Sequence, residues 1–294
     1  MSNQVEGVIL KGIGGFYYVH TGRRQIECKA GGRLRLNRRE KPAVGDRVMV
    51  EERGEEGLIT QILPRKNFLQ RPPIANIDQL FIVASQASPV TDPYLIDKVS
   101  VIALRQGIQP ILVLNKQDVD PSQDFRQIYE KAGFPVLSTS AETGEGVEEL
   151  RQMLRGKVSA FTGNSGIGKS SLLNRLEEGV LMETGSISRI SRGRHTTRRV
   201  ELFFVAEGYL ADTPGFSSFD ISRMEHIPKE ELEQYFPEFE PFLGQCRFSG
   251  CAHCKEPDCA VDQGAREGAI APSRLESYRK LYEEMAQWKE WENK

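Results

Sequence analysis

The feature that most constrains the fold is a glycine-rich motif, GNSGIGKS, at residues 163–170. It fits the pattern G-x-x-x-x-G-K-[ST], follows an apolar run (VSAFT) with strand character, and precedes a helical pattern. In such a unit the backbone N–H groups and the helix N-terminus surround a phosphate chain, which the lysine also reaches. The motif therefore predicts a nucleotide-phosphate site, the alternative being a glycine-rich turn that binds nothing. The residues assigned to it are Gly163, Asn164, Ser165, Gly166, Ile167, Gly168, Lys169, Ser170 and Ser171, with Ser170 also a ligand of Mg²⁺.

A second motif, NKQD, indicates which base is bound. It comprises Asn115, Lys116, Gln117 and Asp118. The motif follows the apolar run ILVL, at the carboxyl end of a predicted strand, where ligands bind in doubly wound sheets. The carboxylate of Asp118 can accept hydrogen bonds from N1–H and the 2-amino group of guanine, whereas adenine would leave it unpaired. The motif favours GTP over ATP, although four such residues also occur in surface turns.

Three further short elements fit the same site. Ser140 and Ala141 follow a predicted strand and match the loop whose backbone contacts the guanine carbonyl oxygen. The sequence DTPG follows the apolar run YLA; its aspartate, Asp212, is expected to approach Mg²⁺ through water, and the N–H of Gly215 to sense the γ-phosphate. Between this element and the phosphate loop lies GRHTTR, which could also be a solvated basic loop. We expect Thr197 to complete the Mg²⁺ shell, with Thr196 as the alternative.

The chain divides into three segments of different texture, which predict a multidomain α/β protein. Residues 1–68 contain short β-runs separated by turns, typical of a small barrel of OB type. Residues 72–220 alternate strand and helix patterns, which predicts a parallel sheet covered by helices. The Pro-rich stretch 64–73 reads as a linker between them. Residues 221–294 are predicted to be a mainly helical, zinc-binding module that ends in an amphipathic helix over 273–291.

Charge and composition limit the setting and the partners. Residues 1–70 carry 13 Lys and Arg against 8 Asp and Glu, a net +5, while the whole chain has a net charge of −2. With the aromatic run 16–18 nearby, this favours an RNA-binding surface on the barrel, although any one of these residues may equally be core or solvated. No apolar run is long enough to span a bilayer and no signal peptide is evident, so we expect a cytoplasmic monomer without membrane contact.

Four of the five cysteines crowd into one short stretch together with a histidine. The pattern C-x4-C-x-H-x5-C offers Cys246, Cys251, His253 and Cys259 as ligands of one tetrahedral, structural Zn²⁺. From spacing alone Cys254 could replace His253. Disulfides are the other alternative, and a reducing compartment disfavours them.

The order of the motifs along the chain is unusual: NKQD, SA, phosphate loop, TT and DTPG. A Ras-like GTPase begins with the phosphate loop, so this order predicts a circularly permuted P-loop GTPase domain. The chain closely resembles the bacterial ribosome small-subunit-dependent GTPase A family, also called YjeQ or YloQ. The resemblance covers essentially the whole chain and depends on GNSGIGKSSLLN, GRHTTR, DTPGFSSF and the metal cluster.

The resemblance implies a function and several residue roles. It implies GTP hydrolysis to GDP stimulated by the 30S ribosomal subunit, binding to 16S rRNA and a role in late 30S maturation. It favours His253 over Cys254 as zinc ligand. Because Phe216 stands where many GTPases have a water-orienting glutamine, the resemblance points to His195 as the catalytic group, the alternative being a histidine that contacts phosphate or rRNA.

Two other classes of function compete with this interpretation. A P-loop ATPase or nucleotide kinase is opposed by NKQD, and a non-enzymatic RNA-binding module by the intact Lys169, Ser170, Asp118 and Asp212. The permutation also joins DTPG directly to the zinc module and places the base-reading elements nearer the barrel in sequence. We therefore expect it to relay nucleotide state to the flanking domains.

Overall fold

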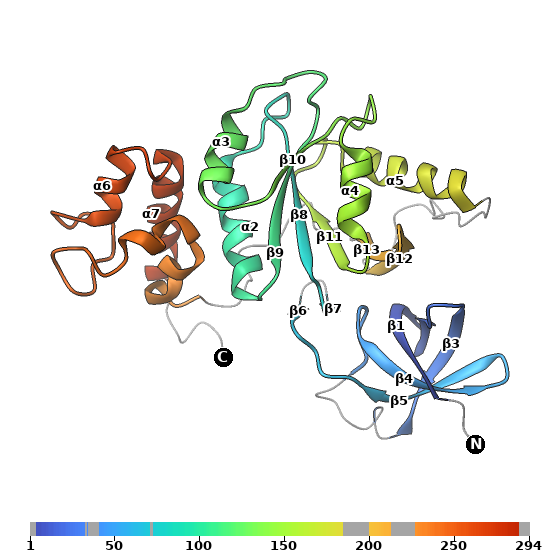
Figure 1. Ribbon diagram of the computed structural model, residues 1–294. Coiled ribbons are helices and arrows are strands. Elements are labelled where there is room, and N and C mark those ends of the chain that lie inside the picture. Colours follow the sequence, from blue (N-terminus) through green and yellow to red (C-terminus); the bar gives the residue numbers. More distant parts are fainter. Residues whose placement is uncertain are drawn as a thin grey trace.

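The computed structural model describes residues 4–32, 34, 41–70, 73–184, 200–212 and 227–287. Along the chain these residues form a β-barrel, a sheet with helices on both faces, and a helical module (Figure 1). Among the described helices none is long and apolar enough to cross a membrane.

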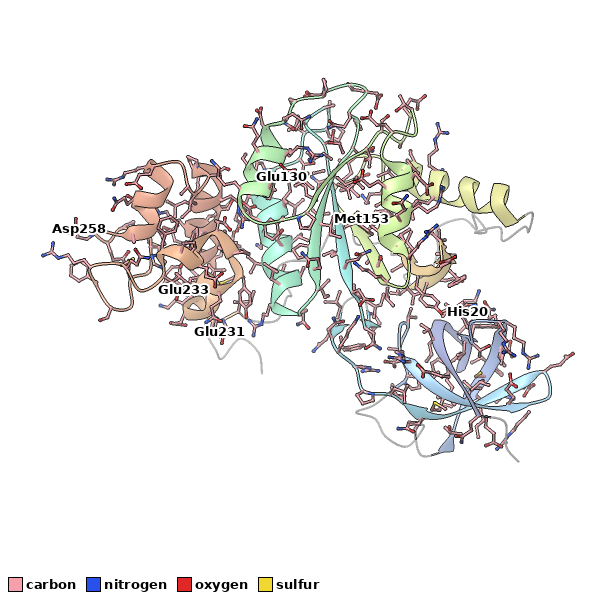
Figure 2. The ribbon with its side chains drawn as sticks, viewed as in Figure 1. His20, Glu130, Met153, Glu231, Glu233 and Asp258 are labelled. Carbon is pink, nitrogen blue, oxygen red and sulfur yellow. The ribbon has the colours of Figure 1, made fainter. Side chains whose placement is uncertain are left out.

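The barrel is closed and has the strand order β1-β2-β3-β5-β4. Its strands are β1 (Gln4–Ile13), β2 (Phe16–His20), β3 (Gln25–Ala30), β4 (Arg47–Arg53) and β5 (Glu56–Ile62). Alternate side chains point inward, because successive residues of a strand face opposite sides. Gly57 is required where β5 crosses the core, since a Cβ there would press on Cys28 and Val50. The predicted OB-type barrel is confirmed, and His20 lies on its side nearest the sheet (Figure 2).

The stretch predicted as a linker lies between the barrel and the sheet and leads into a paired hairpin. Its strands are β6 (Phe68–Gln70) and β7 (Pro73–Ala75), which pair antiparallel. The side-chain amide of Asn67 donates to Ile77 O at 2.8 Å and accepts from Ile77 N at 2.9 Å. Asn76, at a φ of 59°, donates to the Gly45 carbonyl in the barrel. These side-chain bonds join residues that no local pattern pairs, so the sequence did not show that the linker is ordered.

The central sheet has the order β10-β9-β8-β11-β13-β12. Its strands are β8 (Gln79–Ala84), β9 (Gln109–Leu114), β10 (Val136–Ser138), β11 (Val158–Thr162), β12 (Glu201–Val205) and β13 (Gly208–Asp212). Only β12 runs antiparallel to its neighbour, so the predicted parallel sheet is confirmed. The chain first builds outward from β8 and then returns to β11 on its other side. The switch point between β8 and β11 is where open α/β sheets bind ligands.

Helices cover both faces of the sheet (Figure 1). On one face lie α2 (Pro93–Arg105) and α3 (Asp124–Lys131), and on the other α4 (Val147–Leu154) and α5 (Lys169–Thr184). Helix α2 begins sharply because the Asp92 side chain caps the N–H of Tyr94 and proline occupies the first turn. The helix predicted after the phosphate loop is α5, which continues beyond Leu176.

The C-terminal module consists of short helices around an aromatic core. They are η3 (Lys229–Tyr235), η4 (Pro237–Phe242), α6 (Ala260–Arg266) and α7 (Pro272–Ala286). Leu275 and Tyr278 lie on the buried face of α7, the predicted terminal helix, and are 4% and 1% exposed. Tyr278 packs on Phe236 and Phe239, with ring centroids 5.2 and 5.0 Å away. The module is mainly helical as predicted, and its core also includes Val101 of α2.

Candidate nucleotide site and metal centre

The phosphate-loop motif forms the turn between β11 and α5, at the switch point of the sheet. Gly163 and Gly168 have φ angles of 136° and 96°, a region that side chains avoid. A Cβ at Gly163 would collide with the carbonyl of Val83, and one at Gly168 with the side-chain amide of Asn115. Glycine is thus needed for backbone conformation and for close approach to β8 and the NKQD loop.

Of the other residues of the loop, Ile167 points into the core and several others are exposed. The side chain of Ile167 is fully buried in the core under α4 and α5 and anchors the loop. Lys169 Nζ donates to the carbonyls of Gly163 at 2.7 Å and Asn164 at 2.5 Å, so its ammonium lies over the loop. Burial lowers the pKa of Lys169. The remaining predicted phosphate residues, Ser165, Gly166, Ser170 and Ser171, are exposed.

Asn115 joins the three predicted nucleotide loops. Its side chain, 2% exposed, donates through Nδ2 to the Ile167 carbonyl at 2.7 Å. Its Oδ1 accepts from the Ala141 N–H at 3.1 Å and the Thr139 hydroxyl at 3.2 Å. The loops that follow β9, β10 and β11 therefore meet at one edge of the sheet, because parallel strands end on the same side.

The rest of NKQD faces outward beside the Ser140 loop. Asp118 is exposed, and its Oδ1 accepts from the Ser140 hydroxyl at 2.5 Å. Lys116, at a φ of 68°, donates to the Ser88 carbonyl at 2.7 Å. The backbone N–H of Gln117 donates to Thr139 O at 3.2 Å. The carboxylate is thus oriented by one neighbour and accessible to a base.

The structure describes only some of the predicted magnesium and switch residues. Asp212 ends β13, next to β11, and its side chain lies outside the described part. Also outside the described residues are His195, Thr196, Thr197 and Gly215. β13 leads toward the same edge of the sheet as the phosphate loop, because it runs parallel to β11.

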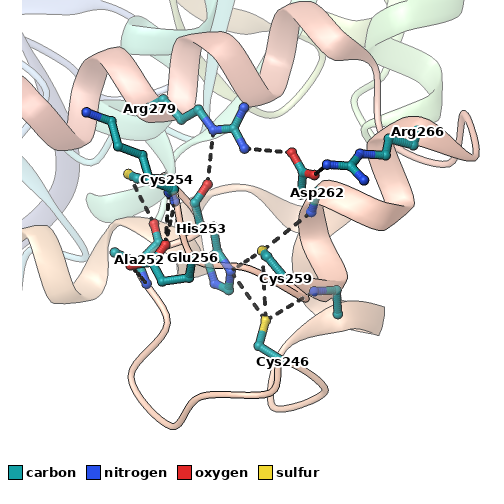
Figure 3. Close-up of polar contacts among 11 residues, drawn as sticks. Cys246, Ala252, His253, Cys254, Glu256, Cys259, Asp262, Arg266 and Arg279 are labelled. Carbon is teal, nitrogen blue, oxygen red and sulfur yellow. Dashed lines mark hydrogen bonds and ion pairs between the residues drawn. The ribbon is translucent and has the colours of Figure 1, made fainter.

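In the C-terminal module, Cys246, Cys251, His253 and Cys259 bring their ligand atoms within 4.8 Å of one another. Cys246 Sγ lies 3.6 Å from His253 Nδ1 and 4.0 Å from Cys259 Sγ (Figure 3). Around a tetrahedral zinc with bonds of about 2.3 Å to sulfur, ligand atoms would be about 3.8 Å apart. These donors therefore fit one tetrahedral ion. Cys254 lies apart, with Sγ 3.3 Å from the Ala252 carbonyl.

Neighbouring groups orient the cluster. His253 Nε2 lies 3.0 Å from Glu233 Oε2, so a carboxylate holds the ring with Nδ1 toward the sulfurs. The N–H groups of Ala260 and Asp262 donate to Cys246 and Cys259 at 3.4 and 3.5 Å. Burial raises the pKa of the Cys251 thiol to about 12, which disfavours the thiolate form that binds metal. A cation among the sulfurs would stabilise that thiolate.

Two residues near these sites carried no local signal in the sequence. Glu233 precedes His253 by 20 residues, and Arg175 reaches the loop after β10 from α5, across 34 residues. Their roles depend on three-dimensional contacts, so no spacing rule would have found them.

A parallel sheet with a phosphate loop after β11, at its switch point, and an N-K-x-D loop after β9, two strands away, defines a P-loop GTPase. The order of its motifs makes it circularly permuted. The chain belongs to the RsgA GTPase family: the model described as RsgA GTPase matches residues 62–222, and that described as RsgA N-terminal domain matches residues 6–59. The expected family is confirmed.

Similar proteins extend over nearly the whole chain. "Small ribosomal subunit biogenesis GTPase RsgA" of Caldanaerobacter subterraneus subsp. tengcongensis is 45% identical, with 96% of each chain covered. The protein of that name from Geobacillus thermodenitrificans is 41% identical, with 97% of this chain and 98% of the other covered. The crystal structure of YjeQ from Thermotoga maritima matches with a TM-score of 0.82 at 36% identity, over 98% of this chain and 100% of that one. YloQ, titled a circularly permuted GTPase, matches with a TM-score of 0.81 at 33% identity, over 98% and 96%.

Proposed function

We propose that this protein hydrolyses GTP to GDP and phosphate, stimulated by the 30S subunit, and acts in the cytoplasm as a late-stage maturation factor of that subunit. The observation that carries the nucleotide part is Asn115, which ties the phosphate loop to both base-reading loops. The ribosomal part rests on the relatives, which are named small ribosomal subunit biogenesis GTPases. The proposed domains are 1–68, 72–220 and 221–294.

In the proposed site each loop has one task. The backbone of the phosphate loop and Lys169 bind the phosphates, and Asp118 accepts from the guanine edge while the Ser140–Ala141 loop faces its carbonyl oxygen. Ser170 and Thr197 would hold Mg²⁺, which neutralises charge on the β and γ phosphates when bound. Asp212 would orient that ion through water and Gly215 would contact the γ-phosphate.

We assign the catalytic role to His195, since Phe216 has no polar group to orient water. His195→Ala should leave GTP affinity nearly intact and lower the turnover stimulated by 30S subunits. Arg194→Ala in the same segment controls for loss of a positive phosphate or rRNA contact. Unchanged stimulated turnover in His195→Ala would overturn the assignment.

The barrel is the proposed rRNA-binding surface. Lys29 lies over the Phe16 ring and Lys11 over the Tyr18 ring, each 5.1 Å from the centroid, so two cross-strand pairs of the barrel each combine a basic and an aromatic side chain. Phosphate contacts release counterions, and association with 30S subunits should therefore weaken steeply as salt rises. A flat salt response would count against an RNA contact. Light scattering should give the mass of a monomer.

We further propose that Cys246, Cys251, His253 and Cys259 bind one structural Zn²⁺. All four positions are filled by protein donors, which leaves no open position for chemistry. Elemental analysis should find one zinc per chain.

The deciding experiment is turnover with GTP and with ATP, each with and without 30S subunits. Turnover of GTP alone, raised by the subunit, supports the proposal. ATP turnover at comparable efficiency would favour an ATPase or nucleotide kinase, and no turnover of either would favour an RNA-binding module.

A further inference from the structure

Arg175 of the phosphate-loop helix contacts the loop that follows β10. It stands six residues after Lys169 on α5. Its Nε donates to the Ala141 carbonyl at 2.9 Å and its Nη2 to the Glu142 carbonyl at 2.6 Å. One guanidinium thus holds two successive carbonyls, and hydrogen bonds with a charged donor are about twice as strong as neutral ones.

This contact completes the fixation of Ala141 from both sides. The N–H of Ala141 donates to Asn115 Oδ1 at 3.1 Å, and its carbonyl accepts from Arg175. The two peptide planes that flank Ala141 are therefore held by different elements, one by the β9 loop and one by α5. Because only φ and ψ of Ala141 relate these planes, the backbone of the predicted carbonyl-reading loop has one orientation.

Three further bonds of the same loop are internal and give it shape without placing it, whereas the Ser140 hydroxyl donates to Asp118 Oδ1 of the NKQD loop. Ser140 N donates to Glu145 O at 3.0 Å, Gly144 N to Ser140 O at 2.9 Å, and Thr143 N to the Ser140 hydroxyl at 3.1 Å. Arg175 contacts the loop from the helix that begins with Lys169. Together with Asn115, which bonds both Ile167 O and Ala141 N, it sets the distance between the phosphate-binding backbone and the base-reading backbone.

We propose that Arg175 is a positioning residue for guanine selectivity: by holding Ala141 and Glu142 it keeps their loop against the 6-carbonyl edge of the base. This inference rests on the proposed GTP site. Without the guanidinium the loop should move, and the site should read the 6-position poorly while Asp118 still reads the 1- and 2-positions.

The test is binding of GDP, 6-thio-GDP and inosine diphosphate to Arg175→Ala. In 6-thio-GDP only the carbonyl oxygen is altered, and inosine diphosphate lacks only the 2-amino group. We expect GDP affinity to fall about tenfold, the order set by losing charged hydrogen bonds. The preference for GDP over 6-thio-GDP should shrink toward one, while the preference for GDP over inosine diphosphate largely persists. Arg175→Lys, whose single ammonium cannot reproduce the fork, should be intermediate.

Arg151→Ala is the matched control. Arg151 lies on α4 and donates to the carbonyls of Arg175 and Leu176 at 3.3 and 3.4 Å, so it supports α5 without contacting the loop. It should leave both preferences unchanged. If Arg175→Ala lowers affinity for the three nucleotides equally, Arg175 is merely structural and the inference fails. If the unmodified protein shows no preference for GDP over ADP, the proposed nucleotide site itself fails.

Discussion

The barrel and the C-terminal module contact the GTPase domain in different ways. The barrel lies against the edge of the sheet, where β1 runs beside β12. Lys11 pairs with Glu201 at 2.9 Å, and His20 Nδ1 lies 2.9 Å from the Tyr209 hydroxyl with its ring 4.5 Å from that of Phe204 (Figure 2). Phe204 keeps 46% of its surface exposed, so this contact is polar, aromatic and open to water.

The C-terminal module is attached across a buried charge. Arg274 of α7, 1% exposed, bonds Asp97 of α2 at 2.6 Å and Glu238 of η4 at 2.6 and 3.1 Å. The rings of Phe134 and Phe236 enclose its guanidinium, with centroids 5.1 and 4.6 Å away. Burial by itself lowers the pKa of Arg274, but Asp97 and Glu238 outweigh it, so the group is charged.

The flanking domain that follows the DTPG element in sequence is therefore not the one that contacts the strands leading to it. The zinc module follows the DTPG element in the chain, yet it packs on α2 beside the base-reading strands (Figure 1). The barrel, at the other end of the chain, contacts the β12–β13 hairpin, which ends at Asp212. A relay of nucleotide state through the direct link to the zinc module stays a prediction. The barrel, in contrast, packs against β12 and β13, the strands that lead to the predicted DTPG switch.

Loss of the metal should have the largest effect. Cys259→Ser removes one of the four proposed ligands, and in small zinc modules metal binding contributes about 10–16 kcal/mol to folding. We expect zinc content to fall and the C-terminal module to melt separately in calorimetry. Cys254→Ser, outside the cluster, should retain both metal and melting profile. Loss of zinc in Cys254→Ser instead would contradict the ligand set.

Arg274→Met should come next. It leaves Asp97 and Glu238 buried without their cation, which costs about 3–5 kcal/mol. Urea unfolding monitored by fluorescence measures the change. Lys98→Met is the control, because its bond to the half-exposed Glu284 lies at the rim of the same contact and should matter far less. Equal effects would show that the buried charge is not what secures the module.

At the barrel contact, Tyr209→Phe should lower the free energy of unfolding by about 0.5–1.5 kcal/mol, since one hydrogen bond is lost and the ring remains.

Burial lowers the pKa of His20 below its usual 6.5, so the folded state disfavours the charged ring. Its contribution is therefore complete above pH 6.5 and is lost as the pH falls below that value. Unfolding curves of the unmodified protein and His20→Gln between pH 8 and pH 5 should converge at low pH. Parallel curves would exclude His20 as the titrating group.

The smallest effect is expected for Lys11 and Glu201, whose side chains are 29% and 38% exposed. A double-mutant cycle with Lys11→Met and Glu201→Gln should give a coupling energy below about 1 kcal/mol, falling further in high salt. Coupling of several kcal/mol would mean that the barrel is held as firmly as the C-terminal module.

Features that depend on residues close together in the chain could be predicted from the sequence. The phosphate loop needs glycine at Gly163 and Gly168 for its φ angles, and the metal cluster needs four soft donors in one short stretch, so both are visible as spacings. Strand and helix patterns likewise located the barrel and the parallel sheet, because burial of one face imposes a period on the chain. Motif order then predicted the permutation.

The contacts between these parts are visible in the tertiary structure alone. Asn115 meets Ile167 across 52 residues, Arg175 meets Ala141 across 34, and Arg274 meets Asp97 across 177. The attachment of the hairpin at residues 68–75 to the barrel escaped prediction for the same reason, since Asn76 bonds a carbonyl 31 residues away. Such bonds form between side chains that the folded sheet brings together, and a pattern that repeats over a few residues holds no record of a distant partner.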